Sequence, residues 1–343
     1  MSRSRFTLDI GAVRQNTRVL VRALDGAELW AVVKADGYGH GAVDVARAAV
    51  EGGARALCVA SVAEALEVRG ALADARLIVL GPAADDEIAA AVSARLELVA
   101  ADGRVPEAVP VHLKLDTGMG RWGLSELVAP GRNVVGLMSH FASSESDPAF
   151  TRLQIKRFRS ATADCGSLTR HLANSAAALA YPESRFDAAR CGIALYGISA
   201  FGDDAAARGL VPALRWESQL ALVKRLEAGE STGYGRSFVA DRPTWIGIVP
   251  VGYADGFRRD LTGTEVVVGA ERCRVVGTVS MDAFAVELPN ELAVGERVSI
   301  LGSGVSAEEH ARVAGTIAYE IVTGLRTARP RAEREVVDRE AVA

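Results

Sequence analysis

Short apolar runs rich in Val, Leu and Ala recur through the first two thirds of the chain. Eight of them stand out, at residues 28–34, 56–60, 76–81, 96–100, 109–116, 134–140, 170–174 and 185–192. Apolar residues return every three or four positions, as along one face of a helix, in four of the intervening segments: 43–53, 62–72, 85–92 and 148–163. Strands and helices therefore alternate, and this order predicts a parallel sheet.

The number of these units indicates how the sheet closes. Continuous apolar runs are typical of strands that are buried on both faces. Eight strand–helix units in about 200 residues match the lower size limit of a (β/α)₈ barrel. We therefore expect an N-terminal TIM-type barrel over residues 8–212. An open, doubly wound sheet is the alternative that this pattern leaves.

The pattern changes after about residue 212. Runs rich in β-formers follow, broken by Gly, Pro and Asn, and the one late segment with helical spacing lies near 307–325. We expect residues 213–343, together with the first few N-terminal residues, to form a second, mainly β domain. The 343 residues suit two domains of ordinary size.

Composition and charge narrow the class of partner. The chain has 39 Lys and Arg against 43 Asp and Glu and no basic stripe, which argues against nucleic acid or an anionic membrane. No apolar run approaches the roughly 20 residues of a membrane span. The four cysteines lie far apart and no histidine has metal-ligand spacing, so we expect no metal site. These features favour a soluble, cytoplasmic protein with a small-molecule partner.

Polar residues follow the apolar runs where a barrel collects its chemistry, at the carboxyl ends of its strands. Several of them are cationic, which indicates an anionic ligand, and a phosphate-bearing cofactor is the simplest one. The residues are Lys34, Lys114 with Asp116 and Arg121, His140, Asn174 with Ser175, and Arg190.

Lys34 lies at the end of the first apolar run, directly before a glycine-rich loop. The glycines complete neither a dinucleotide-binding fingerprint nor a P-loop. A lysine held in a semi-apolar pocket can have a lowered pKa and form a Schiff base with an aldehyde. On spacing alone, a surface lysine with its amine in solvent is the more frequent case.

Nine motifs resemble those of bacterial alanine racemases, in the same order and over nearly the whole chain. They are VVKADGYGHG (32–41), LKLDTGMGRWG (113–123), SHFASSE (139–145), HLANSAA (171–177), RCGIALYG (190–197), TGYGRSF (232–238), VGYADGF (251–257), GTVSMD (277–282) and YEIVTGL (319–325). The resemblance implies a pyridoxal 5'-phosphate-dependent enzyme that interconverts L- and D-alanine, and so supplies D-alanine for peptidoglycan. It also implies a cofactor-carrying barrel, a β domain and a head-to-tail homodimer with shared active sites.

The resemblance identifies two catalytic residues. Lys34 would hold the cofactor and transfer a proton at the substrate Cα on one face, and Tyr234 of the partner subunit would act on the opposite face. A phenol has a free pKa of about 10, so nearby cations would have to lower it for work near neutral pH. Without the resemblance, a buried core tyrosine is the simpler interpretation of Tyr234. Gly233 stands where the family usually has serine.

Two further residues would face the cofactor ring. The resemblance puts Arg190 opposite the pyridine nitrogen and His140 in a hydrogen-bonding chain between Arg190 and the catalytic tyrosine. Because a guanidinium keeps its proton, that nitrogen would stay unprotonated and the ring would withdraw electrons weakly, which favours racemisation over transamination or decarboxylation. The alternatives are a surface ion pair for Arg190 and a core histidine for His140.

The resemblance assigns the remaining residues to the phosphate and to the substrate. The phosphate would contact Tyr38, Asn174, Ser175, Tyr319 and the backbone N–H groups of Gly192 and Ile193. An ordinary helix N-cap is the alternative for Ser175. The substrate would meet Arg121, the Met281 N–H of the partner and Tyr253, which limits side-chain size at the entrance. Ser280 stands where the family often has cysteine, which bears on substrate range.

Lys114 matches a lysine that many members of the family carry in carbamylated form. An unmodified Lys114 would be repelled by Arg121, so either this modification or the Asp116 carboxylate has to neutralise the pair.

Three other functions stay open at this point. A pyridoxal-phosphate carrier protein shares the barrel but lacks the β domain. A barrel-type decarboxylase would need a carboxylate at the ring nitrogen, and Arg190 argues against it. A racemase of serine or another small amino acid is compatible with the same residues.

Overall fold

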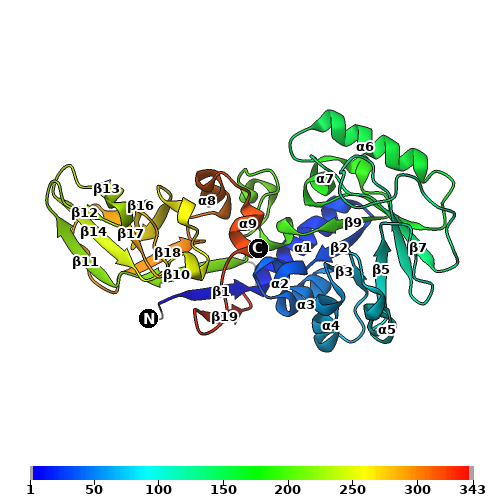
Figure 1. The fold of residues 1–343 in the computed structure, drawn as a ribbon, viewed down its shortest axis with the longest axis horizontal. Helices are drawn as coiled ribbons and strands as arrows, with labels where there is room; N and C mark the ends of the chain where they lie inside the picture. The colour runs from blue at the N-terminus through cyan, green and yellow to red at the C-terminus, as the bar shows by residue number, and fades with distance from the viewer. Residues whose placement is uncertain (1–2, 340–343) are drawn as a thin grey trace. The chain divides into compact units, whose positions relative to one another are not determined.

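The computed structural model describes residues 3–339, which divide into two compact units. The first, here called the barrel unit, is Ala12–Val211. The second, the β unit, joins the described residues up to Gly11 with those from Pro212 onward. Figure 1 follows the chain through both units by colour.

Eight parallel strands form a closed barrel in the order β2-β3-β4-β5-β6-β7-β8-β9. Their bounds are Glu28–Val32, Ala56–Val59, Leu77–Val79, Leu96–Ala100, Val111–Lys114, Val134–Met138, Thr169–His171 and Ala188–Cys191. The first and last strands close it, with Trp30 of β2 opposite Arg190 of β9. The predicted barrel is confirmed, and the doubly wound sheet is excluded.

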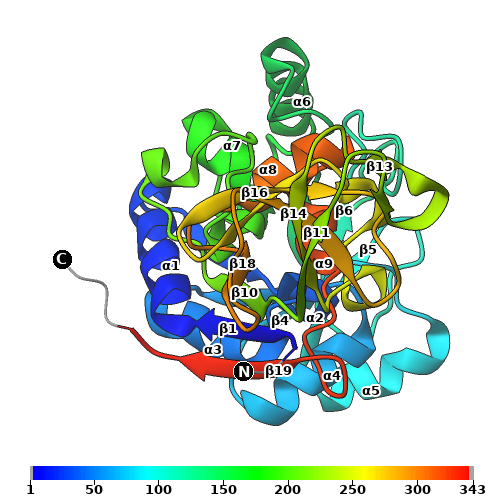
Figure 2. The same cartoon turned by 90° about the vertical axis from the view of Figure 1, so that its left-hand side faces the viewer.

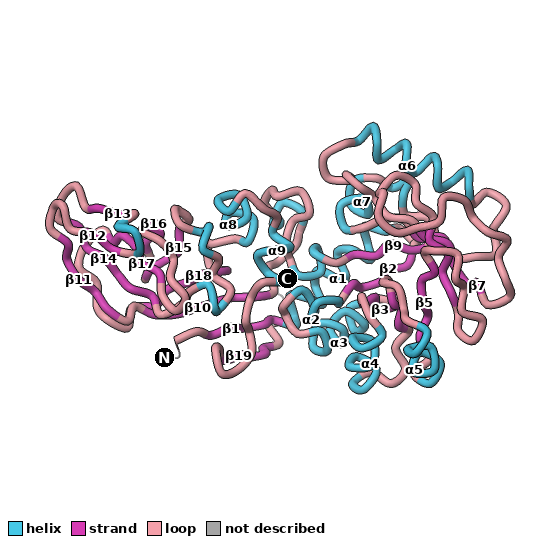
Figure 3. The backbone as a smooth tube through the Cα atoms, in the orientation of Figure 1, coloured by secondary structure: helices cyan, strands magenta, loops and turns pink. Residues whose placement is uncertain are grey.

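Helices follow the strands where the sequence has helical spacing (Figure 3). They are α3 (Ala42–Gly52), α4 (Val62–Ala71), α5 (Ile88–Ser93) and α6 (Pro148–Ala161). Local residues explain where α6 begins, since the Asp147 carboxylate accepts a hydrogen bond from the Phe150 N–H and Pro148 occupies the first turn. A short α7 (Ser175–Ala180) follows β8, and α1 (Ile10–Leu24), which the sequence analysis did not anticipate, precedes β2.

The β unit contains a nine-stranded sheet in the order β11-β14-β17-β16-β15-β18-β10-β1-β19, beside a two-stranded sheet of β12 and β13. Strands β1 and β10–β19 have the bounds Arg5–Asp9, Leu214–Gln219, Leu222–Leu226, Ser231–Thr232, Phe238–Val239, Thr244–Val249, Glu265–Val268, Glu271–Val276, Phe284–Leu288, Arg297–Leu301 and Glu333–Val337. Two helices, α8 (Ala307–Ala314) and α9 (Ala318–Thr323), belong to this unit.

The two ends of the described chain meet in this sheet. Strand β1 pairs in antiparallel fashion with β10 and in parallel with β19, as Figure 2 shows. Phe6 of β1 stacks on Trp216 of β10, with ring centroids 4.9 Å apart. The N-terminal strand is therefore part of the β unit's core.

No helix among residues 3–339 has both the length and the apolar character that crossing a bilayer requires. The same residues contain no group of three or more His, Cys, Asp or Glu side chains that could hold a metal ion.

Candidate active site

Lys34 opens a left-handed turn just beyond the end of β2. The backbone φ angles of residues 35–39 are all positive, between +49° and +78°. Such a conformation costs about 1–2 kcal/mol for each non-glycine residue. Hydrogen bonds within the turn offset part of this cost, among them Gly37 N–H to Val33 C=O at 2.9 Å and Gly39 N–H to Ala35 C=O at 3.0 Å.

Two carboxylates tie this turn to the neighbouring elements. The Asp36 carboxylate accepts a hydrogen bond from the Ala42 N–H, at the start of α3. The Glu64 carboxylate of α4 accepts one from the Ala35 N–H at 2.9 Å and one from the Ala60 N–H at 2.6 Å. Glu64, which the sequence analysis missed, thereby fixes the segment after β2 against the end of β3.

The amine of Lys34 has an unusual environment for a lysine. Its side chain is partly buried, so the alternative of a lysine directed freely into solvent does not describe it. Burial lowers the pKa of Lys34, the positive charges of Arg121 and Arg190 lower it further, and the Glu64 carboxylate raises it. A larger share of Lys34 is therefore neutral, and able to act as a nucleophile or base, than for an ordinary lysine.

Arg190 lies inside the barrel and is only 3% exposed. Its guanidinium donates to the backbone carbonyls of Ser139, His171 and Leu172, at 2.7, 2.8 and 3.2 Å. It also donates to the Nδ1 atoms of His171, at 2.6 Å, and His140, at 3.3 Å. Among residues 3–339 no carboxylate forms an ion pair with it, so the surface ion pair considered for Arg190 is wrong.

The protonation of these groups follows from their contacts. Burial lowers the pKa of Arg190 to about 10, which leaves it charged at neutral pH. Burial and the Arg190 charge hold the pKa values of His140 and His171 well below the usual value, so both imidazoles are neutral. Because it contacts Arg190 directly, His171 is a further candidate site residue, one that the sequence analysis missed. It is the first residue of the HLANSAA motif, which was the available signal.

Three of the residues assigned to the phosphate lie together. The Ser175 hydroxyl accepts hydrogen bonds from the Gly192 N–H at 3.0 Å and the Ala194 N–H at 3.5 Å. A Cβ at Gly192 would lie only 2.3 Å from the Tyr38 hydroxyl, so this position requires glycine. Ile193 follows at the start of the turn Ile193–Tyr196.

Asn174, and not Ser175, caps α7. The Asn174 side-chain oxygen accepts hydrogen bonds from the Ala177 N–H at 2.9 Å and the Ser144 hydroxyl at 3.0 Å. The alternative of an ordinary N-cap for Ser175 is therefore wrong, because its buried hydroxyl contacts the loop after β9 instead.

Lys114 and Arg121 share one aromatic neighbour. Lys114 ends β6, and its ammonium and the Arg121 guanidinium lie 5.5 and 5.4 Å from the ring centroid of Trp122. The Asp116 carboxylate accepts hydrogen bonds from the backbone N–H groups of residues 118–120 and forms no ion pair with either cation. Burial, with Arg121 and Arg190, lowers the pKa of Lys114 to about 8. Asp116 therefore makes no direct ion pair with these two cations, although its charge raises the pKa of Lys114.

Tyr234, Tyr253 and Met281 lie on exposed loops of the β unit. Their side chains are 71%, 44% and 52% exposed, so the alternative of a buried core tyrosine at 234 is wrong. The segment 277–282 connects them: Thr278 donates to the Tyr234 carbonyl, and the Tyr253 N–H donates to the Ser280 carbonyl at 3.0 Å. Hydrogen bonds to the backbone thus link the loops that carry the three side chains.

Gly233 shows why this chain has glycine beside Tyr234. Its φ is +81°, and a Cβ would lie 2.8 Å from the Thr278 backbone nitrogen. A serine here would require the backbone of the 232–235 segment to shift.

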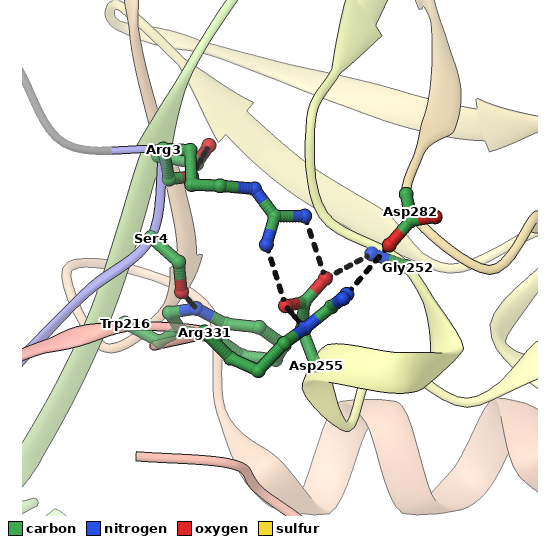
Figure 4. A network of polar contacts seen from close by, with 8 residues as sticks. Arg3, Ser4, Trp216, Gly252, Asp255, Asp282 and Arg331 are labelled. Carbon is green, nitrogen blue, oxygen red and sulfur yellow. Dashed lines mark hydrogen bonds and ion pairs between the residues drawn. The ribbon is translucent and has the colours of Figure 1, made fainter. Parts of the chain in front are cut away.

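A buried carboxylate, Asp255, holds these loops together (Figure 4). It accepts hydrogen bonds from two nitrogens of Arg3, at 3.0 and 3.1 Å, from Arg331 Nε at 2.8 Å and from the Gly252 N–H at 2.9 Å. Arg331 also donates to Asp282 at 2.7 Å, so one guanidinium joins the loop of Tyr253 to the loop of Met281.

The candidate site residues are divided between the two units. The barrel unit carries Lys34, Tyr38, Lys114, Arg121, His140, Asn174, Ser175, Arg190, Gly192 and Ile193. The β unit carries Tyr234, Tyr253, Met281 and Tyr319, of which Tyr319 lies partly buried on α9.

Comparison with known families identifies both units. The family model for the N-terminal domain of alanine racemase matches residues 8–200, and the one for the C-terminal domain matches residues 213–333. The chain belongs to the alanine racemase family. It is accordingly an enzyme of that family, an isomerase, and the resemblance seen in its motifs is confirmed.

Relatives in this family match almost end to end. The alanine racemase of Symbiobacterium thermophilum is 39% identical over 94% of this chain and 95% of its own, and that of Levilactobacillus brevis is 38% identical over 96% and 98%. Among solved structures, the biosynthetic alanine racemase of Pseudomonas aeruginosa has a TM-score of 0.91 and 36% identity over 98% of this chain and all of its own. The enzyme of Bartonella henselae, solved with covalently bound pyridoxal phosphate, has a TM-score of 0.88 and 25% identity, covering 98% of this chain and 100% of its own.

Proposed function

We propose that this chain interconverts L- and D-alanine with pyridoxal 5'-phosphate bound through Lys34, as a homodimer with shared active sites. The observation that carries the proposal is the environment of Lys34. A partly buried amine with a lowered pKa stands at the barrel's strand ends, within the field of Arg121 and of an Arg190 that no carboxylate contacts.

The residues present fit pyridoxal phosphate. Burial lowers the pKa of the Lys34 amine, which favours its reaction with an aldehyde, and the approach of Tyr38 to Gly192 leaves no room for a side chain at that glycine. We assign the phosphate to Tyr38, Asn174, Ser175, Tyr319 and the N–H groups of Gly192 and Ile193. When bound, the cofactor supplies an aldehyde for the amino group and an electron-withdrawing ring that acidifies the substrate Cα–H.

Arg190 determines how strongly that ring withdraws electrons. A guanidinium can only donate, so it requires a lone pair, and therefore an unprotonated nitrogen, opposite it. With Arg190 in this position, the bound ring would withdraw electrons weakly, so Lys34 and Tyr234 would have to limit the charge at Cα by proton transfer. This arrangement favours return of the proton to Cα over side reactions.

The two proton-transfer groups come from two units. Lys34 serves one face of Cα and Tyr234 of the partner subunit the other, with His140 between Arg190 and that tyrosine. Tyr234, Tyr253 and Met281 are large and exposed, and hydrogen bonds link their loops, which supports a surface that a second copy covers.

Arg121 and the Met281 N–H would hold the substrate carboxylate, and Tyr253 would limit the side chain to one as small as that of alanine. Carbamylation of Lys114 would place an anion beside Arg121. A pKa of about 8 supports it, because the neutral amine is the form that reacts with carbon dioxide. The D-alanine product would serve peptidoglycan synthesis, and the four free thiols fit a reducing cytoplasm.

The proposal is tested with purified protein, pyridoxal phosphate and L-alanine in deuterated water, with L-serine and L-lysine in parallel. We expect loss of optical activity and deuterium at Cα with alanine, and much less with the larger substrates. Lys34→Ala protein serves as the control. Faster exchange of serine than of alanine would contradict the assigned substrate.

A further inference from the structure

A buried chain of hydrogen bonds leads away from Arg190 through the inside of the barrel. Arg190 donates to His171 Nδ1 at 2.6 Å, and His171 Nε2 lies 2.9 Å from His112 Nδ1. His112 Nε2 lies 2.8 Å from the Glu97 carboxylate, which two Arg76 nitrogens bind at 2.7 and 2.9 Å. The chain starts on β9, passes through β8 and β6, and ends near the amino end of β5.

A glycine on β7 leaves room for the two histidine rings to contact each other inside the barrel. They lie on β8 and β6, and on the strand between them, β7, Gly136 pairs with His112 while Met138 pairs with His171. A Cβ at Gly136 would lie 2.1 Å from His112 Nδ1, so any side chain there would displace the His112 ring. Trp30 packs against both imidazoles, with ring centroids 4.4 Å from His171 and 5.6 Å from His112.

The donors and acceptors allow one direction of hydrogen bonding. Arg190 has only N–H groups, so His171 Nδ1 carries a lone pair and its proton is on Nε2. That proton is donated to His112 Nδ1, and the His112 proton is therefore on Nε2 and is donated to Glu97. The Glu97 carboxylate can only accept, and Arg190 can only donate. Both therefore require the proton of each histidine ring to be on Nε2.

The charges agree with this direction. Burial alone would raise the pKa of Glu97, but hydrogen bonds from His112 and Arg76 lower it to about 2, so Glu97 is a carboxylate. Burial lowers the pKa values of His112 and His171, so each ring carries a single proton. Along this series of hydrogen bonds, the nearest negative charge is the Glu97 carboxylate, and two imidazole rings separate it from Arg190.

We propose that Glu97 and His112 are positioning residues, which hold the His171 ring with its Nδ1 lone pair toward Arg190 and so keep that guanidinium in its orientation. The Glu97 carboxylate that ends this series of hydrogen bonds pairs with Arg76 at 2.7 Å and does not contact Arg190. The effect on catalysis rests on the proposed function, whereas the arrangement of protons does not.

The proton arrangement is tested on the unmodified protein without cofactor. The chain has five histidines, so their ring nitrogens can be labelled with ¹⁵N and each signal assigned by single His→Gln substitution. Long-range proton–nitrogen correlation spectra identify the tautomer of each ring. We expect His171 and His112 both as neutral Nε2–H tautomers from pH 6.5 to 8.5. An Nδ1–H tautomer or a protonated ring at either position would overturn the proposal.

The role of Glu97 is tested with the double variant Glu97→Leu/Arg76→Met, which removes the acceptor together with the guanidinium that pairs with it. The matched control is Arg76→Met alone, which breaks the same ion pair but keeps the acceptor for His112. We expect the control to retain both Nε2–H signals. In the double variant, the His112 signal should become a mixture of tautomers, and its ring N–H proton should exchange faster with solvent.

The catalytic consequence is measured on the holoenzymes of the same variants. We expect kcat for racemisation to fall roughly tenfold or more in the double variant relative to Arg76→Met. This is the effect expected when a hydrogen bond to a charged group, here from His112 to Glu97, is lost. KM should change little, and pyruvate formed per racemisation should be the same in the two variants, because Arg190 keeps its positive charge in both. Equal kcat values in the two variants would overturn the positioning role. A parent protein with the expected tautomers but no alanine racemisation would instead refute the proposed function and leave the arrangement of protons standing.

Discussion

Arg331 donates a hydrogen bond of 2.8 Å to Asp255, a carboxylate with no exposed surface. The same guanidinium reaches Asp282, next to Met281, while Asp255 accepts the Gly252 N–H, next to Tyr253. This pair therefore holds two loops that carry candidate substrate-binding residues. Arg3 adds the N-terminal segment to the cluster through its two hydrogen bonds to Asp255.

We expect Arg331→Met to destabilise the β unit and to loosen both loops. Asp255 keeps its bonds to Arg3, so the loss should be about 1–3 kcal/mol, that of hydrogen bonds to a buried charge. Thermal unfolding and steady-state kinetics measure the two effects, and KM for alanine should rise more than kcat falls. Arg297→Met is the control, because Arg297 pairs with Glu217 on the surface at 3.0 Å and should cost under about 1 kcal/mol. Equal costs in the two variants would contradict this role for Asp255.

The cofactor lysine is predicted to be Lys34. Borohydride reduction of the holoenzyme, followed by peptide mass analysis, should find the pyridoxyl group on the peptide that contains Lys34. The lowered pKa of its amine explains the preference over exposed lysines. A pyridoxyl group on Lys114, Lys156 or Lys224 would rule out this assignment.

Carbon dioxide is predicted to affect activity through Lys114. With a pKa of about 8, the amine is mostly protonated at pH 7 and increasingly neutral above pH 8, so carbamate formation should strengthen as the pH rises. Protein dialysed at pH 6.5 without bicarbonate should lose activity and regain it on addition of bicarbonate at pH 8.5. A carbamate signal from ¹³C-labelled bicarbonate should be present in the parent and missing from Lys114→Ala. Full activity without bicarbonate, and no such signal, would show that Lys114 acts unmodified.

Much of this architecture could be predicted from the sequence because it follows from local patterns. Eight apolar runs are enough for a barrel, and the motifs locate Lys34, Arg190 and Ser175 along the chain. The left-handed turn after Lys34 was not predictable in the same way. Gly37 and Gly39 favour positive φ, but Ala35 and Tyr38 do not, and hydrogen bonds formed only in the folded protein hold them there.

Contacts between distant residues escaped the sequence analysis for a different reason. Arg3 and Asp255 are 252 positions apart and share no pattern. His171 and His112 meet because β7 has a glycine, Gly136, opposite His112, and only the order of strands in the closed barrel brings these three residues together. Periodicity reports which face of an element is buried, but not which residue of another strand it faces.

Activity is predicted to require two subunits. Lys34 belongs to the barrel unit and Tyr234 to the β unit, where its side chain is 71% exposed. Lys34→Ala and Tyr234→Phe proteins should each be inactive alone, and mixing them should restore activity in heterodimers, which keep one intact site of two. Subunit exchange is verified with differently tagged chains. Heterodimers that form but remain inactive would show that each site draws both residues from one chain.

The last prediction tests the chemistry of Arg190. If its permanent charge keeps the ring nitrogen of the cofactor unprotonated, Arg190→Glu should let that nitrogen take a proton and withdraw electrons more strongly. Racemisation should then slow while pyruvate formed per turnover rises. The substitution also places a carboxylate against the carbonyls of Ser139, His171 and Leu172, so folding and cofactor binding have to be verified by thermal unfolding and absorbance.

Arg190→Lys separates the electronic role from the loss of contacts. Lysine keeps the positive charge but cannot reproduce the fork that reaches three carbonyls and two histidines at once. We expect it to racemise more slowly than the parent with an unchanged pyruvate ratio. If Arg190→Glu binds the cofactor, loses activity and shows the same pyruvate ratio as Arg190→Lys, then Arg190 acts by holding the ring in place, because a protonated nitrogen would have increased transamination in the glutamate variant alone.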